Sequence, residues 1–428
     1  MDHRGHSHHG FPHLPAFALQ HALDRPTGGG QTGSGRPQLT RGAGPPATIL
    51  ILFSDTGGGH RAAAQALRQA LLEIDPSLRI ELLDPLIGQG PALVRQLAQL
   101  YPAIINRSRV AWGMLYRSSN TRAGFAAARS LFGRQVKNNL IEDLLQVDPD
   151  LVISVHPLLN HVAHRAIRSS GRTRAQVTVV TDLVDLHRGW ACPQVDLVVV
   201  PTHEARDQMI QRRVPSARVA LLGMPVGLGF RPPGPGEKGS LRRQLGLDEQ
   251  IPTILVAGGG EGAGRILTQV RELAGDVHPW QLIVVCGRNR RLRERLQGLE
   301  LGTRPLINGF VDNMAELMRA SDVVVTKAGP GAICEALASG LPLLLTGYLP
   351  GQETANVGFV TSSGAGIYVP RSGQLRSALE GMLQDRGAAL ERMVEKTAGM
   401  VRAGAALDIA RRCLDLALAQ RASGQTIR

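Results

Sequence analysis

Several features that mark other classes of protein are scarce in this sequence. Its four cysteines, Cys192, Cys286, Cys334 and Cys413, lie far apart without a CxxC pair, which argues against a disulfide framework or a zinc site. No apolar run approaches the roughly 18 residues that a membrane-spanning helix needs, and the N-terminus has no apolar signal core. Aromatic residues make up only 4% of the chain, which argues against a base-stacking surface for nucleic acid. We therefore expect a protein of a reducing compartment, the cytoplasm, that binds no nucleic acid.

Acidic residues are absent from one long stretch of a chain whose net charge is +13. Between Asp84 and Glu142 the charged residues are all basic: Arg95, Arg107, Arg109, Arg117, Arg122, Arg129, Arg134 and Lys137. Trp112, Leu115, Tyr116, Phe125 and Phe132 are interspersed with them. This composition favours a helix lying on an anionic lipid surface, and it also fits an ordinary helix packed on a sheet with a solvated basic face.

The apolar pattern predicts two α/β domains. Residues 1–46 are rich in His, Gly and Pro without periodicity, which is typical of a disordered tail. From Ala47 onward, short and continuous apolar runs alternate with helical stretches, which indicates parallel strands covered on both faces. The expected strands are Thr48–Ser54, Arg79–Leu83, Leu151–Val155, Gln176–Val180, Leu197–Pro201, Thr253–Val256, Gln281–Val285, Leu306–Asn308, Val323–Thr326 and Leu343–Thr346.

A Pro/Gly-rich segment separates the two series of strands. We expect an N-terminal domain over residues 47–230, a linker over 231–250, a second domain over 251–395 and a closing helical tail over 396–428. Both domains are predicted to be doubly wound parallel sheets, with a cleft between them.

The first chemical motif is the turn Gly57-Gly58-Gly59-His60 after the first expected strand. Consecutive glycines permit a sharp turn and the close approach of a ligand, and His60 then falls in the first helical turn, facing the crevice as a candidate general base. The run through Ala62 also satisfies the dinucleotide pattern GxGxxA, with Glu81 or Asp84 as the ribose acid. Alone, this motif favours a dehydrogenase and a transferase equally, and it allows His60 a mere packing role.

The second half supplies an equivalent set of motifs. The turn Gly258-Gly259-Gly260 follows a strand and is suited to a nucleotide diphosphate, and Arg288 lies at the next strand end. Glu335 is expected at a helix start, where it accepts hydrogen bonds from ribose hydroxyls, although a carboxylate there also stabilises a helix by itself. Gln352 and Glu353 lie in a loop suited to sugar hydroxyls, or form an exposed polar loop.

Asp148-Pro149-Asp150 has the spacing of a metal-binding DxD pair. Because it directly precedes the apolar strand at Leu151, we expect a turn that leads into the strand rather than a metal site.

Six segments resemble the monogalactosyldiacylglycerol synthase and processive diacylglycerol glucosyltransferase family: Asp55–Ala62, Val155-His156-Pro157, Thr181-Asp182, Cys286–Asn289, Lys327–Glu335 and Pro350–Asn356. They are more distantly similar to the lipid-linked N-acetylglucosaminyltransferase of peptidoglycan synthesis. The resemblance covers about residues 48–400. Asp185–Trp190 matches the family only loosely, so no acceptor role is predicted for Trp190.

The resemblance implies a GT-B fold, a UDP-galactose or UDP-glucose donor, and transfer to the 3-hydroxyl of 1,2-diacylglycerol with inversion to a β-glycoside. It implies no metal and no other cofactor. It assigns His60 as the base, and Gly58, Gly59, His156 and Asp182 to the acceptor side. The implied donor-binding residues are Gly258, Gly259, Gly260 and Arg288 at the diphosphate, Phe310 and Val311 at the uracil, Glu335 at the ribose, Gln352 and Glu353 at the sugar, and, with no more specific contact assigned, Gly329 and Gly331.

The expected location is the cytoplasm, with peripheral attachment to the anionic inner face of the cell membrane. Three alternatives stay open at this point. They are a peptidoglycan-type UDP-N-acetylglucosamine transferase acting on a lipid-linked sugar, a UDP-sugar epimerase, and a non-catalytic sugar-nucleotide-binding membrane protein.

Overall fold

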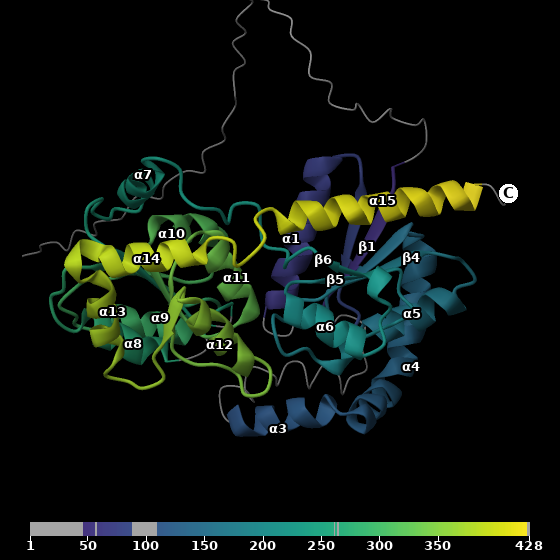
Figure 1. Ribbon diagram of the computed structural model, residues 1–428, viewed down its shortest axis with the longest axis horizontal. Coiled ribbons are helices and arrows are strands. Elements are labelled where there is room, and N and C mark those ends of the chain that lie inside the picture. Colours follow the sequence, from purple (N-terminus) through teal and green to yellow (C-terminus); the bar gives the residue numbers. More distant parts are fainter. Residues whose placement is uncertain (1–45, 56–57, 88–108, 261, 263–264, 426–428) are drawn as a thin grey trace, which may run out of the picture. The chain divides into compact units, whose positions relative to one another are not determined.

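The computed structural model describes residues 46–55, 58–87, 109–260, 262 and 265–425, so the expected N-terminal tail lies outside it. The described chain forms two six-stranded sheets, in the orders β2-β1-β3-β4-β5-β6 and β12-β11-β10-β7-β8-β9 (Figure 1). Every pairing is parallel. The predicted fold class of two doubly wound parallel sheets is confirmed.

Ten strands agree with the expected ones to within two residues. The strands are β1 Thr48–Leu52, β2 Arg79–Leu83, β3 Leu151–Ser154, β4 Ala175–Val179, β5 Leu197–Val200, β6 Val219–Leu221, β7 Thr253–Ala257, β8 Gln281–Val285, β9 Leu306–Asn308, β10 Val323–Thr326, β11 Leu343–Leu345 and β12 Gly366–Tyr368. The two that the sequence did not predict, β6 and β12, are three residues long and lie at sheet edges.

No described helix is long and apolar enough to cross a membrane. The α-helices are α1 Gly59–Ile74, α3 Arg109–Ser119, α4 Arg122–Val147, α5 Asn160–Ser169, α6 His203–Gln211, α7 Glu237–Gln244, α8 Ile266–Ala274, α9 Arg290–Gln297, α10 Met314–Ala320, α11 Pro330–Ala338, α12 Thr354–Ser363, α13 Leu375–Leu383, α14 Ala388–Thr397 and α15 Ala405–Gln425. Short 3-10 helices are η1 Arg188–Trp190, η2 Ser216–Arg218 and η3 Asp385–Gly387.

The first sheet is buried on both faces, which explains its uninterrupted apolar strands. Side chains alternate along a strand, so Ile49 and Ile51 of β1 face α1 and α15, whereas Leu50 and Leu52 face α4 and α5. Helix α15 lies against α1, and its Ile409 belongs to the same core as β1 (Figure 1). The last helix of the expected C-terminal tail thus completes the core of the first sheet.

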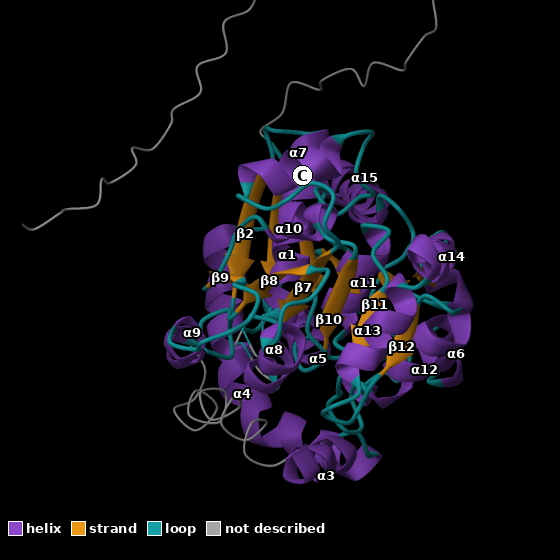
Figure 2. Cartoon of the chain, turned by 90° about the vertical axis from the view of Figure 1, so that its left-hand side faces the viewer, coloured by secondary structure: helices purple, strands orange, loops and turns teal. Residues whose placement is uncertain are grey.

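The second sheet repeats this arrangement. Figure 2 shows its strands side by side between layers of helices. Leu255 of β7 packs with α10 and α11, and its neighbours Ile254 and Val256 pack on the opposite face with α8 and α13. Helices cover both faces of each sheet, so the ends of the strands and the loops that follow them are the parts left to form a site.

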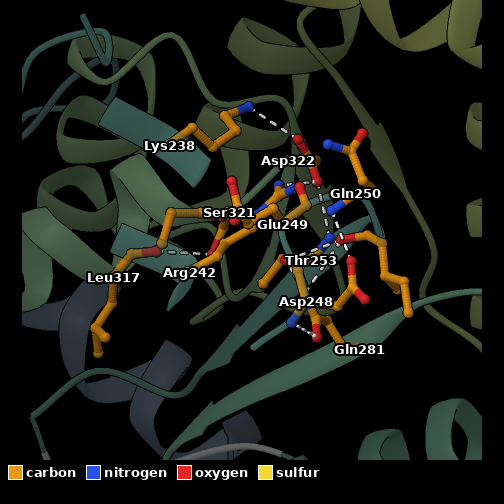
Figure 3. Close-up of polar contacts among 12 residues, drawn as sticks. Lys238, Arg242, Asp248, Glu249, Gln250, Thr253, Gln281, Leu317, Ser321 and Asp322 are labelled. Atoms are coloured by element: carbon orange, nitrogen blue, oxygen red, sulfur yellow. Dashed lines mark hydrogen bonds and ion pairs between the residues drawn. The ribbon is translucent and has the colours of Figure 1, made fainter. Parts of the chain in front are cut away.

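Residues 231–250, expected as a linker, contain helix α7 and are anchored to the second sheet (Figure 3). The buried Arg242 donates to the carbonyls of Ala320 and Glu249 and pairs with Asp322. Asp322 also accepts from Lys238 at 2.8 Å and from the backbone N–H of Thr253 at 2.8 Å. One carboxylate therefore joins α7 to the start of β7.

The described part of the acid-free stretch forms α3 and α4. Tyr116 and Phe125, which the sequence placed among candidate membrane-facing residues, are buried, with ring centroids 5.4 and 5.8 Å from that of His187. Their rings pack inside the protein instead. Leu115 is exposed on α3 as expected, whereas Arg95 and Arg107 lie outside the described residues.

Candidate functional site

A cavity of about 680 Å³ lies at the carboxyl ends of strands from both sheets. Residues 46–428, which include both sheets, form one compact unit through their contacts. The N-terminal turns of α1 and α11 and the residues that lead into α8 all line the cavity. Unpaired N–H groups at helix N-termini favour anions, so this convergence suits a diphosphate.

Nearly all the residues predicted from the sequence line this single cavity. They are Gly58, Gly59, His60, Asp182, Gly258, Gly259, Gly260, Arg288, Phe310, Val311, Gly329, Gly331, Glu335, Gln352 and Glu353. His156 is the exception, since it lies behind His60 and is buried. The roles assigned to these residues stay predictions.

His60 is the second residue of α1, as the glycine turn predicted. Its Nδ1 lies 2.8 Å from the carbonyl oxygen of Val155 and 3.0 Å from the hydroxyl of Thr181. A carbonyl only accepts, so Nδ1 carries the proton and the neutral ring keeps a lone pair on Nε2. Burial lowers the pKa of His60 to about 4, against the raising effect of the Val155 hydrogen bond, so the ring is neutral at pH 7.

Two further buried histidines lie near one another behind this wall of the cavity, and one of them, His156, contacts the His60 ring. The ring of His156 packs edge-on against His60 with centroids 4.5 Å apart, and burial lowers its pKa well below the usual value. His187 accepts from the backbone N–H of Gly189 at 3.1 Å, and burial lowers its pKa to about 4. His156 therefore acts on His60 by packing, behind the cavity wall.

Asp182 is a buried carboxylate that lines the cavity. Its Oδ2 accepts the indole N–H of Trp190 at 2.6 Å. Burial raises the pKa of Asp182 to about 6, although the Trp190 hydrogen bond acts in the opposite direction. Trp190 itself is fully buried and absent from the cavity lining, so its place in the site is to hold Asp182.

The second glycine turn is locked against the turn that carries Arg288. The backbone N–H of Arg288 donates to the carbonyl of Gly260 at 2.9 Å, and a Cβ on Gly287, whose φ is +57°, would lie 2.3 Å from that carbonyl. Glycine is thus required at 287 by both space and conformation. The Arg288 guanidinium lies 4.9 Å from the ring centroid of Phe310, which is exposed, so a charge and a flat apolar face adjoin in the cavity.

Glu335 lies in the second turn of α11 rather than at its start. Burial raises the pKa of its carboxyl to about 7. A group with that pKa is readily ionised by a ligand that donates hydrogen bonds to it, which is what a pair of ribose hydroxyls does.

The loop before α12 brings Gln352 and Glu353 to the cavity in different states. Glu353 is buried, pairs with Lys327 through one oxygen and accepts the backbone N–H of Leu349 at 2.8 Å through the other. The Oε1 atom of Gln352 is buried without a hydrogen-bond partner among the described residues. Buried polar atoms are seldom left unpaired. Gln352 is therefore the member of this pair that is best placed to gain a bond from a ligand.

The structure also decides between the alternatives for the first glycine turn. Asp84 accepts the backbone N–H of Asp55, after β1, through one oxygen and those of Leu86 and Ile87, after β2, through the other, so both oxygens serve loops. Glu81 pairs with Arg79 at the surface. Neither acid lines the cavity, which argues against a ribose-binding acid in the first half.

Asp148 and Asp150 lie at the start of β3, at the opposite end of the strand from the cavity. Asp148 pairs with Arg172 and Arg174, and Asp150 accepts the backbone N–H of Thr48 at 2.8 Å. These contacts agree with the expected turn. Elsewhere in the described chain, no group of three or more His, Cys, Asp or Glu side chains is arranged to hold a metal ion, and metal independence stays a prediction.

The sequence reasoning assigned no role to several polar residues of the cavity. Lys327 and Arg265 add positive charge, and Thr181 and Gln269 add hydrogen-bonding groups. Lys327 was signalled by its position directly before the glycine-rich segment that ends in Glu335, whereas nothing in the local sequence marks Arg265.

Two family models match most of the described chain. Residues 60–226 match the monogalactosyldiacylglycerol (MGDG) synthase model, and residues 253–407 match the glycosyltransferase family 28 C-terminal domain. The first match begins at His60, and the second spans the glycine turn, Arg288 and Glu335.

Relatives and a solved structure agree with the models. Monogalactosyldiacylglycerol synthase 1, chloroplastic, of Arabidopsis thaliana is 36% identical over 80% of this chain and 66% of the relative. Monogalactosyldiacylglycerol synthase 3, chloroplastic, of the same plant is 31% identical over 85% of this chain and 80% of the relative. Acinetobacter baumannii MurG shares the fold, with a TM-score of 0.54, 14% identity, and coverage of 86% of this chain and 100% of that one.

The chain spans 62–66% of the length of several of these curated relatives. Their names also overturn one expectation from the sequence. The protein was expected in the cytoplasm at the inner face of the cell membrane, and this is wrong by the comparison, because the relatives are named chloroplastic.

The fold, the cavity and these matches converge. Two parallel sheets of the GT-B kind carry the expected motifs around one cavity, and a relative is 31% identical over four fifths of its own length. The chain belongs to the monogalactosyldiacylglycerol synthase family.

Proposed function

We propose that this protein transfers galactose from UDP-galactose to the 3-hydroxyl of 1,2-diacylglycerol, making a β-monogalactosyldiacylglycerol. The observation that carries this proposal is the single cavity that holds both His60 and the glycine turns of the second sheet. Its relatives are named for the same lipid product, which favours galactose over glucose as the sugar.

The donor would bind to the second-sheet side of the cavity. Its diphosphate would meet the N–H groups of the Gly258–Gly260 turn and of the α11 N-terminus, together with Arg288. Uracil would lie against Phe310 and Val311, and the ribose hydroxyls would donate to Glu335. As the bond to the sugar breaks, the leaving UDP gains negative charge, and these fixed donors stabilise it without rearranging.

His60 would accept the proton of the attacking hydroxyl. The Val155 carbonyl fixes the tautomer that leaves Nε2 free of a proton, and the low pKa of the ring keeps it neutral. The attack on the face opposite to the leaving UDP inverts the anomeric carbon to the β configuration. Asp182, whose pKa of about 6 lies near neutrality, is another group in the cavity able to take a proton.

We include metal independence in the proposal. Arg288 and helix N-terminal N–H groups supply the positive potential that a bound cation supplies in DxD-type transferases. A transfer rate that is unchanged by a chelator supports this part, and loss of activity that added Mg²⁺ restores contradicts it.

The substrate assignment is tested directly with the full chain. Diacylglycerol is incubated with UDP-galactose, UDP-glucose or UDP-N-acetylglucosamine, and the lipid products are separated on a thin layer. A monohexosyl product formed with UDP-galactose is expected. A product only with UDP-N-acetylglucosamine and a lipid-linked sugar identifies the peptidoglycan-type alternative. Conversion of the donor without acceptor identifies an epimerase, and UDP binding without turnover a binding protein.

The base assignment is tested with His60→Gln. General base catalysis contributes about 10²–10⁴-fold, so the rate should fall by that factor while UDP affinity is retained. The amide keeps a hydrogen-bonding side chain toward Val155, so the fold should persist. A His60→Gln protein that binds UDP and keeps its full transfer rate would show that Asp182 or water takes the proton.

The acceptor is a membrane lipid, so the protein must reach a bilayer, and α3 is the surface proposed for this. Val110, Met114 and Leu115 are 69%, 63% and 52% exposed, and Arg117 is exposed beside them. Apolar groups next to arginine suit the boundary of an anionic bilayer. Met114→Asp should reduce sedimentation with anionic vesicles and leave turnover of a short-chain soluble diacylglycerol unchanged. Equal sedimentation of both proteins contradicts the assignment of α3.

A further inference from the structure

A second cavity of about 380 Å³ lies beside α3, and none of its lining residues lines the first cavity. Its polar walls come from segments far apart in the sequence: Tyr116 and Arg117 of α3, Asn120, Asp185, Gln208 and Arg212. This cavity plays no part in the transfer proposed above.

Two buried polar groups in this cavity lack partners. The hydroxyl of Tyr116 is buried in a residue that is 8% exposed, and it has no hydrogen-bond partner among the described residues. Nη1 of Arg212 is also buried without a partner, whereas its Nη2 donates to the carbonyl of Leu186 at 2.9 Å. Unpaired buried donors cost free energy, so two of them facing one cavity indicate a ligand that accepts hydrogen bonds.

The charges around the cavity favour an anion. Arg117 and Arg212 both line it, and Asp185, which is exposed, is the single carboxylate in the described lining. Asn120 already accepts the backbone N–H of Arg188 through its amide oxygen, so its NH₂ group is the side of the amide that can serve a ligand. The unpaired Nη1 of Arg212 can only donate, the Tyr116 hydroxyl can donate as well, and the arginines outnumber the acid.

The cavity adjoins the loop that carries Gln352. Gly351 lines the cavity, and a Cβ placed on it would lie 3.1 Å from the Tyr116 ring, just as a Cβ on Gly113 would lie 3.0 Å from Pro350. Helix α3 thus rests directly on the Pro350–Gly351 backbone through two glycines. A ligand that orders Tyr116 also orders the start of this loop.

We propose that this second cavity is a binding site for a phosphate-class anion, held by Arg212, Arg117 and the Tyr116 hydroxyl, that stabilises the contact between α3 and the Pro350–Gln352 loop. The anion is either free phosphate or the phosphate of a lipid headgroup.

The test is equilibrium dialysis of the full chain against radiolabelled inorganic phosphate. Tyr116→Phe removes only the unpaired hydroxyl, so the fold is kept, and binding should weaken about ten-fold through loss of one hydrogen bond to a charged ligand. Arg117→Gln should weaken binding at least as much. Arg122→Gln is the matched control, since Arg122 is exposed on α4 and does not line the cavity.

The test must also distinguish phosphate bound in the second cavity from phosphate bound in the sugar-nucleotide cavity. In Arg288→Gln, phosphate binding should persist while UDP binding weakens, whereas Tyr116→Phe should leave UDP affinity unchanged. Three results would each overturn the proposal. They are no saturable phosphate binding, a phosphate affinity in both Tyr116→Phe and Arg117→Gln that equals that of the unchanged protein, and loss of phosphate binding in Arg288→Gln. UDP binding by the same samples shows whether the proposed transferase site stands regardless.

The source of the phosphate is resolved by competition. Vesicles of phosphatidylcholine mixed with phosphatidic acid should displace labelled phosphate if the site takes a lipid headgroup, and vesicles of phosphatidylcholine alone should not. Equal failure of both kinds of vesicle to displace it assigns the site to free phosphate. Displacement by both kinds alike contradicts a phosphomonoester site.

Discussion

Replacing Trp190 with phenylalanine removes the indole N–H that donates to Asp182 at 2.6 Å and leaves most of the ring in place. The pKa of Asp182 is about 6 in the folded protein, raised from 3.8 first by burial, so ionising this carboxyl costs stability. That cost is absent below the unfolded pKa and develops as the pH rises toward 6. Without the indole donor, the pKa in the folded protein should rise further, and the extra cost should develop between about pH 6 and pH 7.

The magnitude follows from the strength of the lost bond. A hydrogen bond to an ionised group is worth about 1.5–3 kcal/mol, and one to the neutral acid about 1 kcal/mol. The difference, about 0.5–2 kcal/mol, corresponds to a rise of roughly one pKa unit. Trp190→Phe should therefore lose about 1 kcal/mol more stability at pH 8 than at pH 5.

The assay is urea unfolding of the full chain at a series of pH values. Trp280→Phe is the control, because Trp280 is equally buried and its indole donates to the carbonyl of Leu273, which does not titrate. Both variants lose packing and one hydrogen bond, so only Trp190→Phe should show the pH-dependent part. If the difference in unfolding free energy between the two variants stays constant from pH 5 to pH 8, the coupling of Trp190 to the Asp182 charge is refuted.

Three further changes probe other parts of the structure. UDP should bind more tightly as the pH rises through about 7, because ribose hydroxyls donate to ionised Glu335. Calorimetry of Glu335→Gln should find weaker UDP binding that no longer depends on pH. A pH dependence that persists in this variant would assign the titrating group elsewhere. Asp322→Asn should lower the free energy of unfolding in urea by about 3 kcal/mol, because it leaves the buried Arg242 without its ionic partner. Glu249→Gln, at the exposed pair with Arg243, should lower it by under about 1 kcal/mol. Similar losses in the two variants would contradict the network of Figure 3. Gly287→Ala should abolish UDP binding or unfold the second half. Its control, Gly381→Ala, lies in open space on α13 and should leave the melting temperature unchanged or raise it. A Gly287→Ala protein with unchanged UDP affinity would show that the turn can relax.

The sequence predicted the strands well because parallel, doubly covered strands such as β7 and β10 are continuous apolar runs. It missed β6 and β12, three-residue strands at sheet edges, although it found β9, an edge strand of the same length. The placement of His60 and of the second glycine turn was also predictable. Each follows a strand, and the carboxyl ends of parallel strands meet at one edge of a sheet.

Contacts between distant loops were beyond reach of the sequence. The pairing of Lys327 with Glu353 depends on how far two loops of the second sheet approach each other. The bond from Trp190 to Asp182 depends on the fold of η1, a segment that matched the family pattern only loosely. Motif spacing gives the order of such residues along the chain but not the distance between their side chains.

The position of α15 has a consequence for how the protein is made. The first sheet buries Ile49 and Ile51 against Ile409, Cys413 and Ala417, so one face of that core is closed by residues that are synthesised after the whole second sheet. During synthesis, the face of the first sheet that carries Ile49 and Ile51 is not covered by α15 until the entire second sheet has been translated. Exposed apolar surface of this kind is prone to aggregation, so synthesis of α15 is the step that protects the first sheet.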